Sequence, residues 1–209
     1  MCLSLCYHKG LGVEKDFDME VWWLQKAVEK GNMDAVNNLG TCYEEGWGVT
    51  KDCKEAVRLY RRAACQGNHE AQYNLGQCYC IGVGIARDEA IGIEWLKKAA
   101  DQGNAKALNE LGRCYHHGRG VEKNDVKAAQ LFQLAADKGN VDALYHLGLC
   151  YQVGAGVQKD PAKASQFLQA AANKGHFAAK TRLLPHPLIA CALVVGLSWI
   201  YLKLNPAAK

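Results

Sequence analysis

The residues of this sequence that could do chemistry are its ten cysteines and seven histidines. Half of the cysteines recur every 36 residues, each directly before a tyrosine, at Cys6, Cys42, Cys78, Cys114 and Cys150. Thiols can form disulfides, but equivalent positions on packed helices lie about 8–10 Å apart. A disulfide needs its two Cα atoms within about 7 Å of each other. We therefore expect these thiols to be reduced and buried as small apolar side chains.

The other cysteines and the histidines offer one candidate metal site. Cys80, His116, His117 and His146 could bring a thiolate and imidazoles to one face, where zinc is one interpretation. An exposed face with polar histidines is the other, favoured because no close pair of cysteines is matched by a second pair. Cys53 and Cys65 are twelve residues apart on one helix, about 18 Å along its axis, so they cannot pair. We expect no metal, no cofactor and a reducing compartment.

Groups for enzymatic chemistry are scarce. The chain has three serines and three threonines, and none lies in the setting of a nucleophile elbow. Its Gly-x-Gly motifs do not follow a strand, as dinucleotide binding requires. A formal charge of +4 without a run of basic residues disfavours nucleic-acid binding. We expect a protein that is not an enzyme and that binds neither nucleic acid nor a small-molecule substrate.

The 36-residue period predicts a repeated helical hairpin. A Gly-x-Gly follows each recurrent tyrosine, and apolar residues at helical spacing fill the segments on both sides. The second helix can be capped by Asp16, Asp52, Asp88, Asn124 and Asp160. The first helix contains Gly40, Gly76, Gly112 and Gly148. Each such glycine costs about 1 kcal/mol relative to alanine, which predicts close packing against the partner helix. The second helix should pack into a neighbour through Trp23, Leu59, Trp95, Leu131 and Phe167.

Hairpins this short cannot bury an apolar face alone, so they should stack into an elongated solenoid with a continuous core. The expected units span about residues 1–31, 32–67, 68–103, 104–139 and 140–175. A closing half-unit at 176–184 completes a solenoid domain over 1–184. The predicted fold is all-α, a right-handed α-solenoid of about five hairpins plus a C-terminal hydrophobic helix.

Each unit reads Ala-x-x-x-Leu-Gly-x-Cys-Tyr-x-x-Gly-x-Gly-Val-x-Lys-Asp, followed by a helix that ends near Ala-Ala-x-x-Gly-Asn. Over about residues 1–182 this pattern resembles the Sel-1-like repeat (SLR) family, a relative of the tetratricopeptide repeats, whose period is 34. The resemblance implies an adaptor that holds protein partners. Some cysteine-rich bacterial members bridge two cysteines in every unit. Here only Cys65 resembles such a position, and Ala71 leaves it without the expected partner.

Two residues depart from the repeat. Ser4 stands where later units have the mid-helix glycine. Because this position lies only three residues after Met1, we expect the first unit to lack the start of its first helix. Gly92 replaces the alanine of other units, which predicts a weaker third unit because glycine destabilises a helix interior.

In solenoids of this kind the first helices line the concave face, where extended or helical peptides bind. By register, the expected lining is Asn37, Tyr73, Asn109, Tyr145, Asn38, Asn74, Glu110, His146, Glu44, His116 and Gln152. These side chains suit hydrogen bonding to a peptide or helix of a partner protein, with Tyr73 and Tyr145 as anchors. An ordinary solvated face is the alternative, and Asn38 and Asn74 could instead bind a neighbouring loop.

The tail, 185–209, begins with Pro185 and Pro187, which should end the last helix. Residues 188–202 are an uncharged run of fifteen, whereas a spanning helix typically needs about 20 residues. We expect a transmembrane anchor over 188–204. A hydrophobic helix that caps the end of the solenoid is the alternative.

An anchor so near the C-terminus would be inserted after synthesis and would leave the solenoid facing the cytosol, at the mitochondrial outer membrane or the endoplasmic reticulum. The predicted function is recruitment of protein partners by a membrane-tethered adaptor. A lumenal quality-control component of the endoplasmic reticulum is the alternative, as in relatives that carry such repeats before a membrane helix. The lack of any Asn-x-Ser/Thr acceptor disfavours it.

Overall fold

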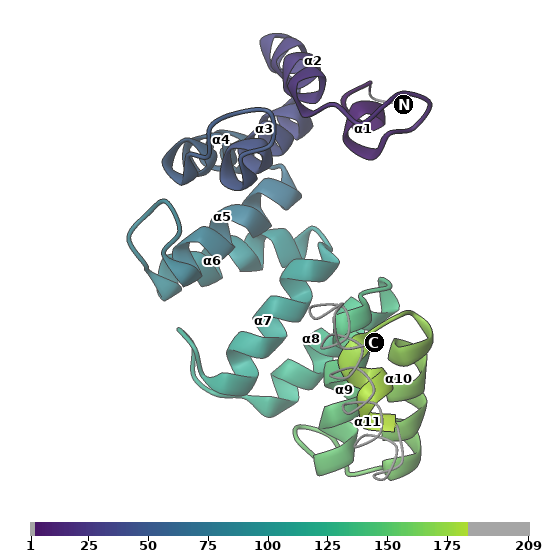
Figure 1. Ribbon diagram of the computed structural model, residues 1–209. Helices are drawn as coiled ribbons and strands as arrows, with labels where there is room; N and C mark the ends of the chain where they lie inside the picture. Colours follow the sequence, from purple (N-terminus) through teal and green to yellow (C-terminus); the bar gives the residue numbers. More distant parts are fainter. Residues whose placement is uncertain (1–2, 184–209) are drawn as a thin grey trace, which may run out of the picture.

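The structure is a computed structural model that describes residues 3–183. These residues form eleven α-helices and no strand (Figure 1). The first helices of the units are α1 (Leu3–Lys9), α3 (Met33–Glu45), α5 (His69–Ile81), α7 (Ala105–His117) and α9 (Val141–Val153). The second helices are α2 (Phe17–Glu29), α4 (Cys53–Cys65), α6 (Glu89–Asp101), α8 (Asp125–Asp137) and α10 (Pro161–Asn173). The closing helix is α11 (Phe177–Leu183). The predicted all-α solenoid of about five hairpins is confirmed.

The helices α2 to α10 each begin directly after a capping asparagine or aspartate. Asn32 precedes α3, and its Oδ1 accepts a hydrogen bond from the Ala35 amide at 2.8 Å. Asp52 precedes α4, and its Oδ1 accepts from the amides of Lys54 and Glu55. These bonds satisfy amide groups that have no partner within the helix. The predicted caps of the second helices are thus confirmed at Asp16, Asp52, Asp88, Asn124 and Asp160.

The first and second helices of a unit touch at the mid-helix glycine. A Cβ atom added to Gly112 would lie 2.7 Å from Cε1 of Phe132 on α8, too close for any real contact. Gly40 has the same relation to Tyr60. The expected close packing is confirmed. The side chain that fills the notch, however, is one residue beyond the position that carries Trp23 and its equivalents.

From the second unit on, the second glycine of each Gly-x-Gly joins its unit to the unit before it. A Cβ at Gly84 would collide with the carbonyl oxygen of Cys53, in the first turn of α4. Gly156 lies equally close to the carbonyl of Asp125, in the first turn of α8. The backbone of this loop therefore packs directly on the start of the preceding unit's second helix, which any larger side chain would prevent.

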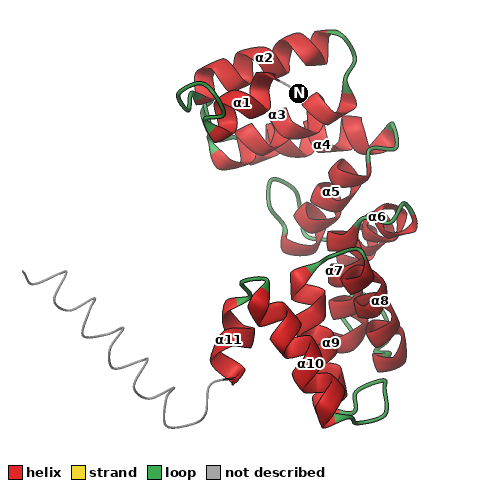
Figure 2. Cartoon of the chain, turned by 90° about the vertical axis from the view of Figure 1, so that its right-hand side faces the viewer, coloured by secondary structure: helices red, strands yellow, loops and turns green. Residues whose placement is uncertain are grey.

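The helices stack in chain order. Within residues 3–183, every helix pair in extensive contact is a pair of consecutive helices. Figures 1 and 2 show the resulting elongated, curved stack, with α1 and α2 at one end and α11 at the other. The recurrent cysteines lie in its core; Cys42 is 1% exposed and Cys6, the most exposed of them, 8%. The expectation of buried thiols is confirmed.

The predicted tail lies outside the described residues. This applies to the anchor over 188–204 and to the whole segment 185–209. Among the helices of residues 3–183, none is both long and apolar enough to cross a membrane. The closing half-unit, expected at 176–184, is present as α11.

Candidate partner-binding surface

The predicted partner-binding residues all lie on the first helices α3, α5, α7 and α9. Asn38 and Gln152 are exposed, and the half-buried members of the set are Tyr73, Asn74, Glu110, Tyr145, His146, Glu44 and His116. Asn37 and Asn109 are only 7% and 5% exposed. Their side chains face the interior of the stack, so the structure does not bring them to a surface that a partner could reach.

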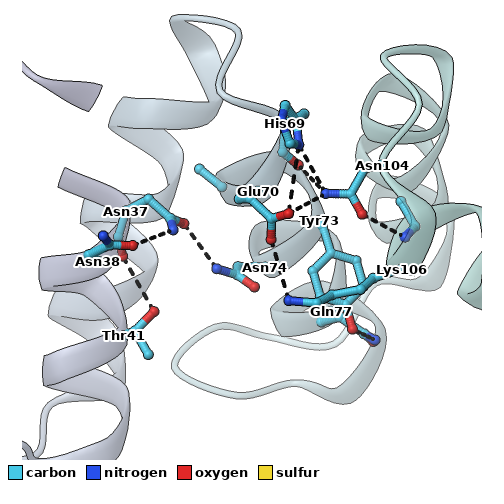
Figure 3. A network of polar contacts seen from close by, with 12 residues as sticks. Asn37, Asn38, Thr41, His69, Glu70, Tyr73, Asn74, Gln77, Asn104 and Lys106 are labelled. Atoms are coloured by element: carbon cyan, nitrogen blue, oxygen red, sulfur yellow. Dashed lines mark hydrogen bonds and ion pairs between the residues drawn. The ribbon is translucent and has the colours of Figure 1, made fainter. Parts of the chain in front are cut away.

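Two of the predicted residues connect two repeats, and a third binds one of them on the same helix. Nδ2 of Asn74 on α5 donates a hydrogen bond to Oδ1 of Asn37 on α3 at 2.9 Å (Figure 3). Nδ2 of Asn37 in turn donates to Oδ1 of Asn38 at 3.3 Å. Asn74 thus binds a neighbouring helix rather than a neighbouring loop. This part of the predicted surface therefore holds α3 against α5.

A second set of inter-repeat hydrogen bonds was not expected from the sequence. Asn68, the N-cap of α5, donates to Oδ1 of Asp34 in the first turn of α3 at 2.6 Å. Asn104, the N-cap of α7, donates to Oε1 of Glu70 in the first turn of α5 at 3.0 Å (Figure 3). One asparagine therefore caps its own helix with its oxygen and binds the previous unit with its nitrogen. The signal in the sequence is an acidic residue 34 residues before the cap.

This set is broken at one junction. Next to Asn140, the N-cap of α9, the equivalent position holds Lys106. An ammonium group cannot accept a hydrogen bond, and Lys106 Nζ lies 3.5 Å from Oε2 of Glu70 instead. The junction between the third and fourth units thus has the inter-repeat bond, and the next junction lacks its acceptor.

The two predicted tyrosine anchors are packed between repeats. The hydroxyl oxygen of Tyr73 accepts a hydrogen bond from Gln77 at 3.1 Å, and its ring packs on the core. Burial raises the pKa of this phenol. The ring of Tyr145 stacks on His176 with centroids 4.4 Å apart. Both tyrosines are half-buried, so part of each side chain remains accessible.

Glu44 binds within its own unit. The hydroxyl of Tyr60, on α4, donates to Oε2 of Glu44 at 2.6 Å and lies 3.2 Å from Oγ1 of Thr41. Burial, and next the hydrogen bond to Glu44, raise the pKa of Tyr60. Glu44 is therefore held by the second helix of its own unit.

Three cavities open between the first helices of consecutive units. The N-terminal pocket, about 280 Å³, lies between α1 and α3 and is lined by residues such as His8, Glu20 and Trp47. The central pocket, about 200 Å³, lies between α5 and α7, with Cys80 and Glu110 in its lining. The C-terminal pocket, about 220 Å³, lies between α7 and α9, with His116 and His146 in its lining. Together with the exposed residues between them they form what we call the first-helix surface.

The repeats of this fold are matched by a family profile. The profile of the Sel1 repeat matches residues 2–32, 34–68, 69–104, 105–140 and 141–176. The chain belongs to the Sel1 repeat family. Sel1 repeat proteins are generally protein-interaction scaffolds and typically have no enzymatic activity.

Solved structures of other Sel1 repeat proteins are similar. The protective antigen c5321 of uropathogenic Escherichia coli, which displays an SLR fold, is 39% identical with a TM-score of 0.75. The match covers 87% of this chain and 39% of that protein, so this chain spans well under half of it. A Sel1 repeat protein from Oxalobacter formigenes is 34% identical with a TM-score of 0.81, over 87% of this chain and 74% of that one. No curated protein matches the chain.

A cysteine-rich relative is also similar. Cysteine rich protein B of Helicobacter pylori is 26% identical with a TM-score of 0.51, over 64% of this chain and 96% of that one. In the Sel1 repeats described here, the cysteines of residues 3–183 are free thiols. Burial raises the pKa of Cys42 and of Cys78 to about 12. These thiols are therefore protonated near neutral pH.

The candidate metal ligands do not assemble. Among residues 3–183, no group of three or more histidine, cysteine or acidic side chains is placed to hold a metal ion. His116 Nδ1 lies 2.6 Å from Oδ1 of Asp125. The ring of His146 stacks on Phe132 with centroids 5.1 Å apart, and burial lowers its pKa to about 4. His146 is therefore neutral at physiological pH.

Sequence reasoning missed the arginines of the surface. Arg113 lies between the central and C-terminal pockets and contributes to the lining of both. Arg119 lines the central pocket from a loop, and Arg182 lines the C-terminal pocket from α11. Only Arg113 lies on a first helix, at a register position that the sequence analysis did not select.

We predict that an asparagine cap contributes more to the free energy of unfolding when it also makes an inter-repeat hydrogen bond. Asn140→Ala removes a cap and should lower the free energy of unfolding by about 1 kcal/mol. Asn104→Ala removes the same cap and also the hydrogen bonds to Glu70 and His69 of the preceding unit, so it should cost a further ~0.5–1.5 kcal/mol. Urea denaturation followed by circular dichroism measures both. Equal losses for the two variants would show that the bond to Glu70 contributes nothing.

Proposed function

We propose that this Sel1 repeat chain is a non-enzymatic adaptor that binds a segment of a partner protein along its first-helix surface. The observation that carries the proposal is the row of three cavities between consecutive first helices. Each cavity has about the size of one or two side chains, so successive side chains of an extended or helical segment could enter successive pockets. The general role of Sel1 repeat proteins as interaction scaffolds supports it.

The chemistry of the surface suits a peptide. Its rim carries amide, imidazole and guanidinium groups, which bind backbone carbonyls and side chains, and its floor carries apolar groups such as Leu96 and Phe132. A polar rim around apolar pockets is the usual anatomy of a protein interface. The second helices carry exposed basic side chains such as Arg62 and Lys97, beside exposed apolar ones such as Leu134.

We predict that peptides selected on this protein contact the first helices. A random dodecapeptide library displayed on phage is panned on the full chain, and the best peptide is bound to variants with a photo-cross-linking side chain. Cross-linking is expected at Asn38 and Gln152, which are exposed on α3 and α9. Matched controls are Gln130 and Gln166, which are exposed on the second helices α8 and α10. Cross-linking at the controls alone, or no enriched peptide, would contradict the proposed function.

The membrane tether is a second part of the proposal. The support is the sequence of residues 188–202, fifteen uncharged and mostly apolar residues, together with Lys203 directly after them. We propose that this run inserts into the mitochondrial outer membrane or the endoplasmic reticulum and leaves the repeats in the cytosol.

Carbonate extraction and protease protection of the tagged full chain test the tether. The chain should stay with membranes at high pH, and its repeats should be digested by protease added to intact vesicles. Release by carbonate would contradict an anchor. Protection of the repeats would instead favour a lumenal quality-control component of the endoplasmic reticulum.

A further inference from the structure

The C-terminal pocket carries a concentration of positive charge. As far as residues 3–183 line it, it contains two arginines, Arg113 and Arg182, and three histidines, but no aspartate or glutamate. Arg119 lies beside it, in the lining of the adjacent central pocket, with which the C-terminal pocket shares Arg113. Three guanidinium groups therefore gather within two neighbouring cavities.

The acidic groups near these pockets already have partners. Glu110 pairs with Arg113, and Asp125 pairs with His116 and with Lys123 at 3.4 Å. The remaining acid of the central pocket, Glu89, pairs with Arg87.

Two of the arginines are left without a carboxylate. Arg119 is exposed and makes no ion pair within residues 3–183. Arg182 donates through Nε to the amide oxygen of Gln152 at 3.1 Å, a neutral partner. Two guanidinium groups thus remain free to bind an anion from another molecule.

The positive charge of the arginines helps to lower the pKa of two neighbouring histidines. The pKa of His117 is lowered, first by burial and then by His116, Arg119 and Arg113. The pKa of His146 is lowered by burial and next by Arg113. Both imidazoles are therefore discouraged from adding further charge, and the arginines supply the cationic character near neutral pH.

Exposed aliphatic side chains flank the arginines. Ile81 and Val153, the last residues of α5 and α9, are 66% and 68% exposed. They occupy the same register two repeats apart, and each lines one of the two pockets. The cationic centre thus lies between two aliphatic contact points.

The other end of the first-helix surface differs in charge. Within the part of the chain that the structure describes, the N-terminal pocket is lined by Glu20 and by no lysine or arginine. Glu20 occupies the register that holds alanine or glycine in later units, and it lies 3.0 Å from Nδ1 of His8. The N-terminal pocket therefore lacks the guanidinium groups with which the other end attracts an acidic ligand.

We infer that the central and C-terminal pockets select a protein segment that combines acidic side chains with aliphatic ones. Guanidinium groups bind carboxylates with two parallel hydrogen bonds, while Ile81 and Val153 offer apolar contact. Because arginines line the central and C-terminal pockets and not the N-terminal pocket as described within residues 3–183, the acidic part of the segment lies over the C-terminal units. This inference rests on the proposed function and specifies the class of its partner.

The peptide library tests this inference through the composition of the selected peptides. Three versions of the full chain are panned in parallel at low salt: the parent, Arg119→Gln with Arg182→Gln, and Arg62→Gln with Lys97→Gln. The last pair removes the same charge from exposed positions on the second helices α4 and α6. Peptides from the parent and from the control should be enriched in aspartate and glutamate beside aliphatic residues. Peptides from the Arg119/Arg182 variant should lose that enrichment.

Binding of the best acidic peptide gives the second readout. Its affinity, measured by fluorescence anisotropy, should fall about tenfold or more in the Arg119/Arg182 variant and stay within about twofold in the control. Enriched peptides without acidic residues, or equal losses in the two variants, would overturn the inference while leaving peptide binding intact. Stronger binding of a single-stranded oligonucleotide than of the acidic peptide would overturn it in favour of a nucleic-acid partner.

Discussion

The close approach of two helices at a glycine is the contact on which the structure depends. In each of the four later units the first helix lacks a side chain where the second helix inserts a large one, as at Gly112 and Phe132. A helix of thirteen residues is marginal alone in water, so it persists only if its apolar face is buried against its partner. The pair then presents a second apolar face, which the next unit covers, and the chain grows as a stack.

The first-helix surface is a consequence of this stacking. Because the backbone is repeated, equivalent positions return at the same place in each junction, and the side chains there can vary without disturbing the scaffold. One such position holds His8, Glu44, Cys80, His116 and Gln152. Its neighbour on the second helix varies with it. Sγ of Cys80 lies only 2.5 Å from where a Cβ of Gly92 would be. The glycine, which weakens its own helix, therefore leaves space for this thiol.

The sequence predicted the structural features that recur in every repeat. The caps, the buried cysteines and the helix notches recur in unit after unit, and each recurrence has one physical cause. The mid-helix glycine predicted close packing, but not which residue of α8 would meet it, because Leu131 and Phe132 are both apolar and only the helix rotation separates them.

The surface was harder to predict because its residues do not recur. Asn37 and Asn109 are buried, whereas Tyr73 and Tyr145, which occupy the same register in other units, are half-buried. Arg119 lies in a loop and Arg182 in the closing helix α11, whereas all the predicted surface residues lie on first helices. Their juxtaposition with Arg113 depends on how neighbouring units pack in space, which no spacing along the chain specifies.

The most direct measurement of the central contact is the stability of Gly112→Ala by urea denaturation. In an open helix this substitution would raise stability by about 1 kcal/mol. The account predicts a loss of about 1–3 kcal/mol, because the new methyl group overlaps the ring of Phe132. In combination with Phe132→Leu, which frees space, it should cost less than the sum of the two single changes. A Gly112→Ala protein more stable than its parent would contradict the account.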